Sequence, residues 1–121
     1  MKRVLAVDDD PTILAIEEKV LHGEGYEVVL ARDGETALSL IREQHFDLLL
    51  VDIMMPGVDG FAVSRSLKSD AKNRRVPVIF ISSRSDPEAS REGFRSGGCL
   101  YLCKPFSAVQ LARLVKAVAG H

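Results

Sequence analysis

The chain has 121 residues, of which 46% are hydrophobic, and a formal net charge of -1 at pH 7. This length fits one domain with a substantial core and leaves no room for a second domain. Acidic and basic residues are interspersed, which excludes the charge pattern of a nucleic-acid-binding or membrane-binding surface. The N-terminus has two cations and then a short apolar run, too brief for a signal peptide or a membrane span, so we expect a cytoplasmic protein.

Apolar runs alternate five times with segments of helical periodicity, beginning with a strand. The predicted strands cover 3–8, 27–31, 47–52, 77–82 and 100–103. The predicted helices cover 11–24, 34–45, 59–71, 87–97 and 107–119. Three strands are continuously apolar rather than alternating, at 4–7, 48–51 and 78–81, which is typical of parallel strands covered by helices on both faces. The sequence therefore predicts a single α/β domain with a parallel sheet.

Residues suited to helix ends lie at the boundaries of these segments. Two of the predicted helices begin with an acid followed by proline, a favourable N-cap and first-turn pair, at Asp10-Pro11 and Asp86-Pro87. Further N-cap candidates are Asp33, Asp59 and Ser107, and the glycines suited to end helices are Gly25 and Gly97 or Gly98.

Two other features of the chain have a structural interpretation. Cys99 and Cys103 are four residues apart and lack partner ligands, so we expect ordinary buried thiols rather than a zinc site or a redox pair. Apolar residues of the first helix span about 160° of its circumference, wider than packing on a sheet requires: Ile13, Leu14, Ile16, Val20 and Leu21. This stripe is either a generous core face or a core face with one exposed edge.

Residues suited to binding a divalent metal or a phosphate lie at the ends of four of the predicted strands. They are the acidic pair Asp8 and Asp9, then Asp52, Ser82 and Lys104. Taken singly, each has an ordinary explanation as a helix cap, a turn former or a solvated lysine. Together they lie at the carboxyl ends of parallel strands, which meet at one edge of a sheet. Three clustered carboxylates favour a hard cation such as Mg²⁺, and a lysine and a hydroxyl beside them suit a phosphoryl group.

The chain resembles the receiver domain of two-component response regulators, and the resemblance covers residues 1–121. It rests on four motifs in order: Asp8-Asp9, Asp52-Ile53-Met54-Met55-Pro56-Gly57-Val58-Asp59-Gly60, Ser82, and Tyr101-Leu102-Cys103-Lys104-Pro105-Phe106. The resemblance implies a flavodoxin-like, doubly wound parallel sheet of five strands in the order 2-1-3-4-5, with five helices. The chain is similar to single-domain chemotaxis-type regulators, and it equally fits the receiver of a longer protein.

The resemblance also implies the roles of the acidic residues. Asp52 would accept a phosphoryl group from a sensor histidine kinase, a phosphotransfer protein or a small phosphodonor. Asp9 and Asp52 would hold Mg²⁺ together with the backbone carbonyl of Met54, and Asp8 would reach the ion directly or through water. Such a domain is not a turnover enzyme, although it assists its own phosphorylation and dephosphorylation.

The response to phosphorylation is implied in the same way. Lys104 and Ser82 would contact the phosphoryl oxygens, and the Ser82 hydroxyl would draw its loop inward. Tyr101 would change rotamer to follow that loop. The Lys104-Pro105 bond resembles the family's cis-proline, which would direct the lysine into the site.

The partners implied by the resemblance are a kinase or phosphotransfer protein and a downstream effector. Ile13, Ile16 and Phe106 are the candidates for docking the histidine-bearing bundle. Cys99 and Leu100 replace acids that bridge a dimer in regulators joined to winged-helix domains, so we expect a monomer or a weak dimer.

Two other functions remain possible from the sequence. The segment Asp8-Asp9-Asp10-Pro11-Thr12 fits the Asp-x-Asp-x-Thr motif of haloacid-dehalogenase-like phosphatases, which would make Asp8 a turnover nucleophile. A degenerate receiver would act only as an unphosphorylated interaction module.

Overall fold

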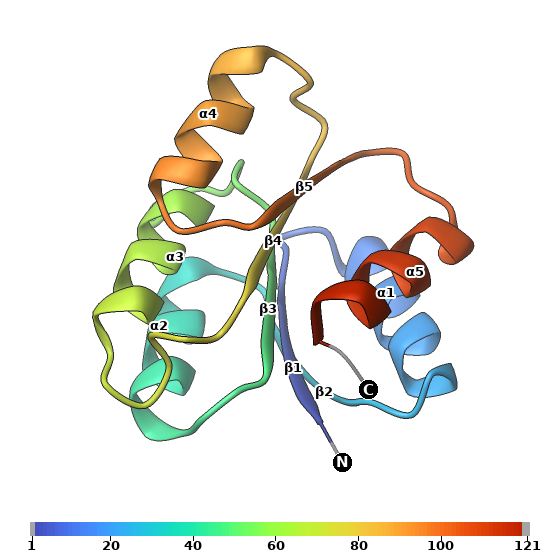
Figure 1. Ribbon diagram of the computed structural model, residues 1–121, viewed down its shortest axis with the longest axis horizontal. Coiled ribbons are helices and arrows are strands. Elements are labelled where there is room, and N and C mark those ends of the chain that lie inside the picture. The colour runs from blue at the N-terminus through green and yellow to red at the C-terminus, as the bar shows by residue number, and fades with distance from the viewer. Residues whose placement is uncertain (1, 120–121) are drawn as a thin grey trace.

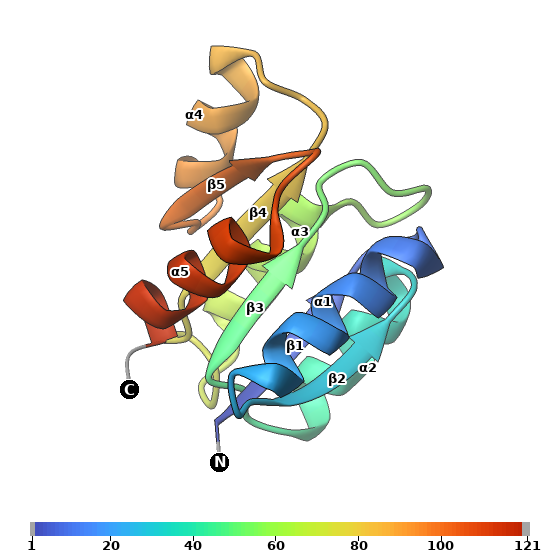
Figure 2. The ribbon, with the colours of Figure 1, turned by 90° about the vertical axis from the view of Figure 1, so that its right-hand side faces the viewer.

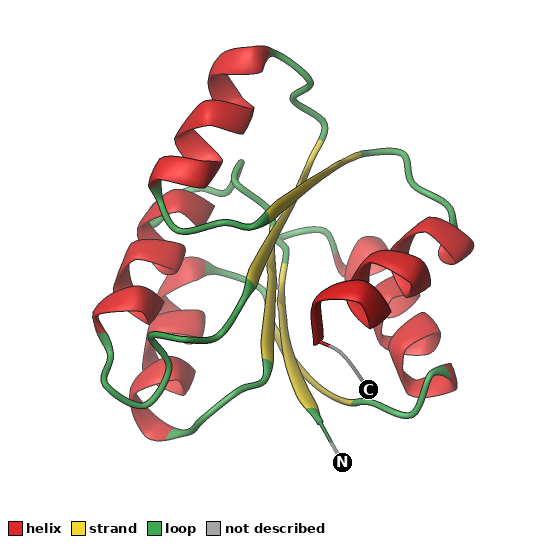
Figure 3. Ribbon diagram, in the orientation of Figure 1, coloured by secondary structure: helices red, strands yellow, loops and turns green. Residues whose placement is uncertain are grey.

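The computed structural model describes residues 2–119, in which a parallel sheet lies between two layers of helices (Figure 1, Figure 3). The strands are β1 (Arg3–Val7), β2 (Glu27–Ala31), β3 (Leu48–Val51), β4 (Val78–Ser82) and β5 (Leu100–Cys103). The helices are α1 (Pro11–Gly23), α2 (Gly34–Glu43), α3 (Gly60–Ser69), α4 (Pro87–Arg95) and α5 (Ala108–Ala119). The expected domain of 1–121 also includes Met1, Gly120 and His121, which lie outside the described residues.

The five strands pair in parallel in the order β2-β1-β3-β4-β5. Helices α1 and α5 cover one face of the sheet, and α2, α3 and α4 cover the other, as the edge-on view of the sheet in Figure 1 shows. Figure 2 shows α1 and α5 in front of the strands. The doubly wound, flavodoxin-like fold implied by the sequence is therefore confirmed, with every predicted element present.

The three central strands are buried on both faces, as their continuous apolar runs predict. Alternate side chains of β3 point into different layers. Leu49 and Val51 pack in the layer below α2, α3 and α4, whereas Leu48 and Leu50 pack below α1 and α5. This two-sided burial fixes the strand ends in space, and the residues that follow β1 and β3 are held with them.

All four predicted acidic N-caps accept a hydrogen bond from a backbone N–H in the first turn of their helices: Asp10, Asp33, Asp59 and Asp86. At α5, the Ser107 hydroxyl accepts from the Gln110 N–H at 3.0 Å, and the Gln110 side chain accepts from the Ser107 N–H at 2.9 Å. This reciprocal pair is a capping box, so the predicted cap at Ser107 is confirmed.

The prediction of buried cysteines is wrong, because Cys99 and Cys103 are both exposed. β5 pairs only with β4, so it lies at the edge of the sheet. Of its residues only Leu102 is buried. Among the described residues, no helix has the length and apolar character that crossing a membrane requires.

Candidate functional site

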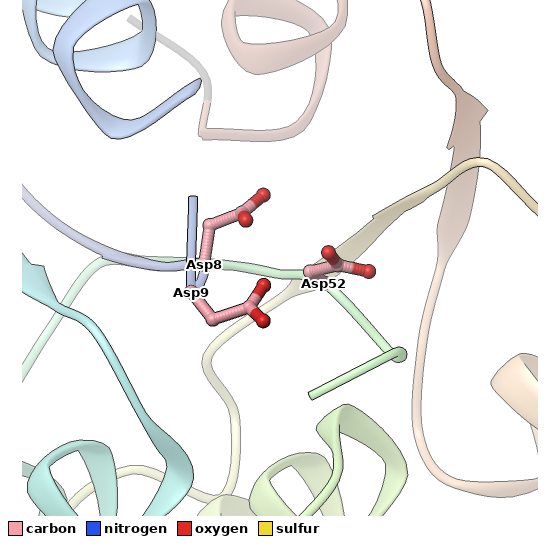
Figure 4. A group of neighbouring side chains, drawn as sticks. All are labelled: Asp8, Asp9 and Asp52. Carbon is pink, nitrogen blue, oxygen red and sulfur yellow. The ribbon is translucent and has the colours of Figure 1, made fainter. Parts of the chain in front are cut away.

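The acidic residues lie at the carboxyl edge of the sheet, where β1 and β3 end side by side. The register of these strands pairs Val7 with Val51, so the residues that follow, Asp8 and Asp52, come next to each other. Carboxylate oxygens of Asp8, Asp9 and Asp52 all lie within 4.8 Å of one another. Figure 4 shows the three side chains extending from the two strand ends into one space. The expected carboxylate cluster is therefore present.

Lys104 joins this cluster from the loop between β5 and α5. Its ammonium donates to Asp8 Oδ2 at 2.8 Å and to Asp52 Oδ2 at 3.0 Å. The backbone of Lys104 is fixed to the end of β4, because its N–H donates to the Ser82 carbonyl at 2.8 Å. The Lys104-Pro105 bond is cis, as the resemblance implied. Lys104 thus bridges two of the three carboxylates.

The electrostatics of the cluster reflect both burial and this bridge. Burial raises the pKa of Asp8 and outweighs its hydrogen bonds from Lys104 and from the Asp10 N–H. Burial alone would lower the pKa of Lys104, but its hydrogen bonds to Asp8 and Asp52 outweigh burial and leave that pKa raised. The site therefore holds the Lys104 ammonium ion and several carboxylates. The single positive charge of Lys104 neutralises only part of their negative charge.

Asp52 is 5% exposed, and both of its carboxylate oxygens have donors. Oδ1 accepts from the Met54 N–H at 3.0 Å, and Oδ2 accepts from Lys104. A Cβ at Gly60 would lie 2.4 Å from the Asp52 carbonyl oxygen, so the first residue of α3 packs directly against the backbone of Asp52. The close approach explains why the segment after Asp52 has a glycine at this point.

Ser82 and Tyr101 lie on neighbouring strands and meet the same loop. Ser82 ends β4, is fully buried, and its hydroxyl accepts a long hydrogen bond of 3.3 Å from the Arg84 N–H. The Tyr101 hydroxyl donates to the Arg84 carbonyl at 2.7 Å. The loop after β4 is therefore attached to both residues predicted to form the switch.

Glu17 is a buried acid that the sequence analysis did not single out. It is 2% exposed, and its Oε1 has no hydrogen-bond partner among the described residues. Burial first, and then the charge of Asp8, raise the pKa of Glu17 to about 8, against an opposing effect of Lys104. The sequence contained a signal: at about 100° per residue, position 17 falls inside the 160° arc of the apolar stripe on α1.

One edge of α1 is exposed, as one of the two interpretations of its wide stripe required. Ile16 is 42% exposed, whereas Ile13 and Phe106 are half-buried. Ile16 lines a groove of about 500 Å³ between α1 and α5, together with Lys19, Val20, Gly23, Glu24, Ala108, Val109 and Ala112. The three docking candidates are not brought together into one groove, since only Ile16 lines it.

Residues 4–116 match the family model of the response regulator receiver domain. Over 116 residues, 96% of this chain, the identity is 37% to the DNA-binding response regulator MtrA of Mycolicibacterium smegmatis and 39% to the response regulator PleD of Caulobacter vibrioides. These matches cover 50% of MtrA and 26% of PleD, so the chain spans half or less of the curated relatives' length.

Solved structures of similar chains have the same fold. The chemotaxis protein CheY4 of Vibrio cholerae matches with a TM-score of 0.93 and 31% identity, covering 98% of each chain. The receiver domain of the sensor histidine kinase PA1611 from Pseudomonas aeruginosa PAO1 matches with a TM-score of 0.90 and 29% identity, covering 99% of this chain and 98% of that one. Its structure has a magnesium ion coordinated in the active site cleft. The chain described here belongs to the response regulator receiver domain family of two-component signalling systems.

Proposed function

We propose that Asp52 is the phosphoacceptor of this receiver domain and that a sensor histidine kinase or phosphotransfer protein is the donor. The observation that supports this most directly is the cluster of Asp8, Asp9 and Asp52, whose carboxylate oxygens lie within 4.8 Å of one another beside the Lys104 ammonium. Asp52 is the central member, because it directly follows β3, the middle strand of the sheet.

Mg²⁺ is the cofactor that fits these residues. Hard oxygen donors are what this ion prefers, and the proposed ligands are Asp8, Asp9, Asp52 and the backbone carbonyl of Met54, with Asp8 binding directly or through water. The Asp9 carboxylate is exposed and accepts no hydrogen bond within the described part of the chain, so it is available as a ligand. When bound, the ion would offset the negative charge of the carboxylates and of the incoming phosphoryl group.

In the proposed transfer, an Asp52 carboxylate oxygen attacks the phosphorus atom of a phosphohistidine. The P–N bond breaks, its electron pair returns to the imidazole, and an acyl phosphate forms on Asp52. Before transfer, Lys104 donates to Asp52 Oδ2, and it lies where its ammonium can turn to a phosphoryl oxygen. The chain's contribution is mainly positioning and charge stabilisation, which is how proteins generally catalyse phosphoryl transfer.

The same residues provide the proposed response. The acyl phosphate would carry about -1.5 to -2 charge in place of the single charge of the Asp52 carboxylate, and Lys104 and the Ser82 hydroxyl would bind it. Ser82 and Tyr101 are both attached to Arg84 by hydrogen bonds, so a movement of Ser82 changes the support of the Tyr101 hydroxyl. We expect Tyr101 to change rotamer and the loop before α4 to move with it.

The proposed partners are the phosphodonor and a downstream effector. Ile13, Ile16 and Phe106 are the proposed docking residues for the histidine-bearing bundle, and the exposure of Ile16 supports its part in this surface. We expect the domain to be a monomer or weak dimer, to bind no nucleic acid itself, and to act in the cytoplasm. Its only catalytic activity would be the phosphorylation and dephosphorylation of its own Asp52.

Acetyl phosphate labelling tests the proposed acceptor and both alternatives. The protein is incubated with acetyl phosphate and Mg²⁺, with EDTA as the control, and the phosphate is mapped by mass spectrometry. A Mg²⁺-dependent acyl phosphate on Asp52 supports the proposal. Rapid turnover through Asp8 would instead support the phosphatase alternative, and the absence of any label would support the unphosphorylated interaction module.

A further inference from the structure

A second group of charged side chains lies away from the acidic site, between α3 and α4. Arg65, Lys68 and Arg95 line a hollow of about 310 Å³ together with Ser69, Ser96 and Gly97. Its lining residues come from the C-terminal half of α3 and the end of α4. Figure 1 shows that both helices lie on the face of the sheet opposite α1 and α5. No acidic residue lines it.

Two of these cations are held in place by hydrogen bonds rather than by ion pairs. An Arg65 guanidinium N–H donates to the hydroxyl of Ser96 at 3.2 Å, and Ser96 is only 3% exposed. The Lys68 ammonium donates to the Val76 carbonyl at 2.6 Å. A Cβ at Gly97 would lie 2.8 Å from Lys68 Cγ, so the lysine chain lies directly across this glycine. Both cations are thus oriented before any ligand arrives.

Neither cation has a counter-charge in the part of the chain that the structure describes. Within residues 2–119, no carboxylate lies within 4.0 Å of the charged nitrogens of Arg65 or Lys68. Burial lowers the pKa of Lys68, as expected for an ammonium ion that loses water without gaining an acidic partner. Among the described residues, the one ion pair of Arg95 is an exposed contact of 3.5 Å with Glu88.

A second hollow of about 330 Å³ shares the lining residues Arg65 and Ser69 with the first and is also lined by Arg42, Ser66 and Asp70. The one acid there, Asp70, lies beside Lys72 at 3.4 Å. A cation in the last turn offsets the dipole of its helix, which accounts for Arg42, Lys68 and Arg95 individually. Three such helix ends meet at Arg65, which lies before the last turn of α3 and has no such role.

We propose that these two neighbouring hollows bind a small anion carrying two or more phosphate groups, either an inorganic polyphosphate or the phosphate chain of a nucleotide. Planar guanidinium groups bind phosphate oxygens in pairs, and lysine contributes a point charge. An anion with more than one phosphate fits because the cations line two hollows that share Arg65, and a single phosphate would contact the cations of only one hollow. The site is independent of the acidic cluster and of the proposed acceptor role of Asp52.

Titration with tripolyphosphate, followed by backbone amide NMR shifts, tests this proposal. The buffer contains EDTA and no Mg²⁺, so that metal-bridged binding at the acidic cluster is excluded. We expect saturable shifts at residues 65–69 and 95–98, with affinity that falls as salt is added. In Arg65→Gln/Lys68→Gln the affinity should fall about tenfold or more, since both charged donors are lost.

A matched control variant removes two cations from the opposite face, Lys19→Gln/Arg113→Gln, and should bind as the wild type does. Arg95→Gln, at an exposed position, gives a second measurement if the double variant in α3 does not fold, and it should also weaken binding. Equal losses in the variants of both faces, or no saturable shift up to about 10 mM, would overturn the proposal. ATP and adenosine are compared with tripolyphosphate: adenosine should not bind, and ATP binding without tripolyphosphate binding would contradict phosphate recognition.

Discussion

Glu17→Gln should make the protein more stable at alkaline pH while leaving its stability at acid pH nearly unchanged. Burial is the main reason that the pKa of Glu17 rises from 4.5 to about 8. Between these two values the folded protein keeps the Glu17 proton and the unfolded chain releases it. The stability that the wild type gains from keeping this proton is therefore fully present below the pKa of Glu17 in the unfolded chain. It is lost as the pH rises through the pKa of Glu17 in the folded protein.

The size of this effect follows from the shift. A rise from 4.5 to about 8, at 1.36 kcal/mol per pKa unit, corresponds to on the order of 3–5 kcal/mol in the free energy of unfolding. Gln is neutral at every pH and does not suffer this loss. The charged groups that act on Glu17 are Asp8, Asp52 and Lys104. They are present in both proteins, so their own titration largely cancels in the difference.

Urea unfolding followed by circular dichroism measures this difference at about pH 5 and about pH 9. The free energy of unfolding of Glu17→Gln minus that of the wild type should grow by a few kcal/mol from the lower pH to the higher pH. Glu18→Gln, which removes the neighbouring carboxyl from outside the buried stripe of α1, should show no such growth. A wild-type curve that runs parallel to the Glu17→Gln curve across this range would refute the argument.

Three further predictions follow from the hydrogen bonds and charges. Asn73→Ala should lower the free energy of unfolding, measured by urea titration, by about 2–4 kcal/mol. The reason is that the buried Asn73 side chain accepts a hydrogen bond from the Phe46 N–H and donates to the Ile41 and Gln44 carbonyls. A loss below about 0.5 kcal/mol would contradict this prediction. Mg²⁺ at about 100 times its Kd should add about 2.7 kcal/mol to the free energy of unfolding of the wild type and raise its Tm by several degrees. Without metal, Asp9→Ala should be more stable than the wild type, and Mg²⁺ should not raise its Tm. Equal Tm values for the wild type with and without Mg²⁺ would count against the metal site. Lys104→Ala should still accept a phosphoryl group. Its amide NMR shifts across residues 82–106 on adding the phosphoryl mimic beryllofluoride should be much smaller than those of the wild type. A full wild-type response in this variant would contradict the role of Lys104 in the switch.

Much of the fold was predictable because burial on two faces leaves a strong trace in the sequence. The central strands are continuous apolar runs, and acidic N-caps precede four helices, so each of those elements begins within a residue of the expected position. The helix C-termini were predicted up to two residues too long at α2, α3 and α4. Periodicity continues past the last helical hydrogen bond, so it does not define where a helix stops.

The site was predictable where strand order determines it. Asp8 and Asp52 had to meet once β1 and β3 were neighbours, and the four motifs implied that order. Lys104 illustrates what the pattern did not contain: its bridge to two carboxylates depends on the path of the loop after β5. The exposure of Cys99 and Cys103 was missed because thiols are usually buried, and their position at an edge strand depends on which strand pairs with β5.

Phosphoryl incorporation into Asp52→Asn tests the central claim most directly. Wild-type protein and the variant are incubated with acetyl phosphate and Mg²⁺, and the hydroxylamine-labile label on each is quantified. Asp47→Asn, a substitution at the opposite end of β3, is the matched control for loss of one carboxylate. We expect the label on the wild type and on Asp47→Asn to map to Asp52, and Asp52→Asn to remain unlabelled, because an amide oxygen is a poor nucleophile. Wild-type levels of label on Asp52→Asn, mapped to another residue, would contradict the assignment of Asp52 as the phosphoacceptor.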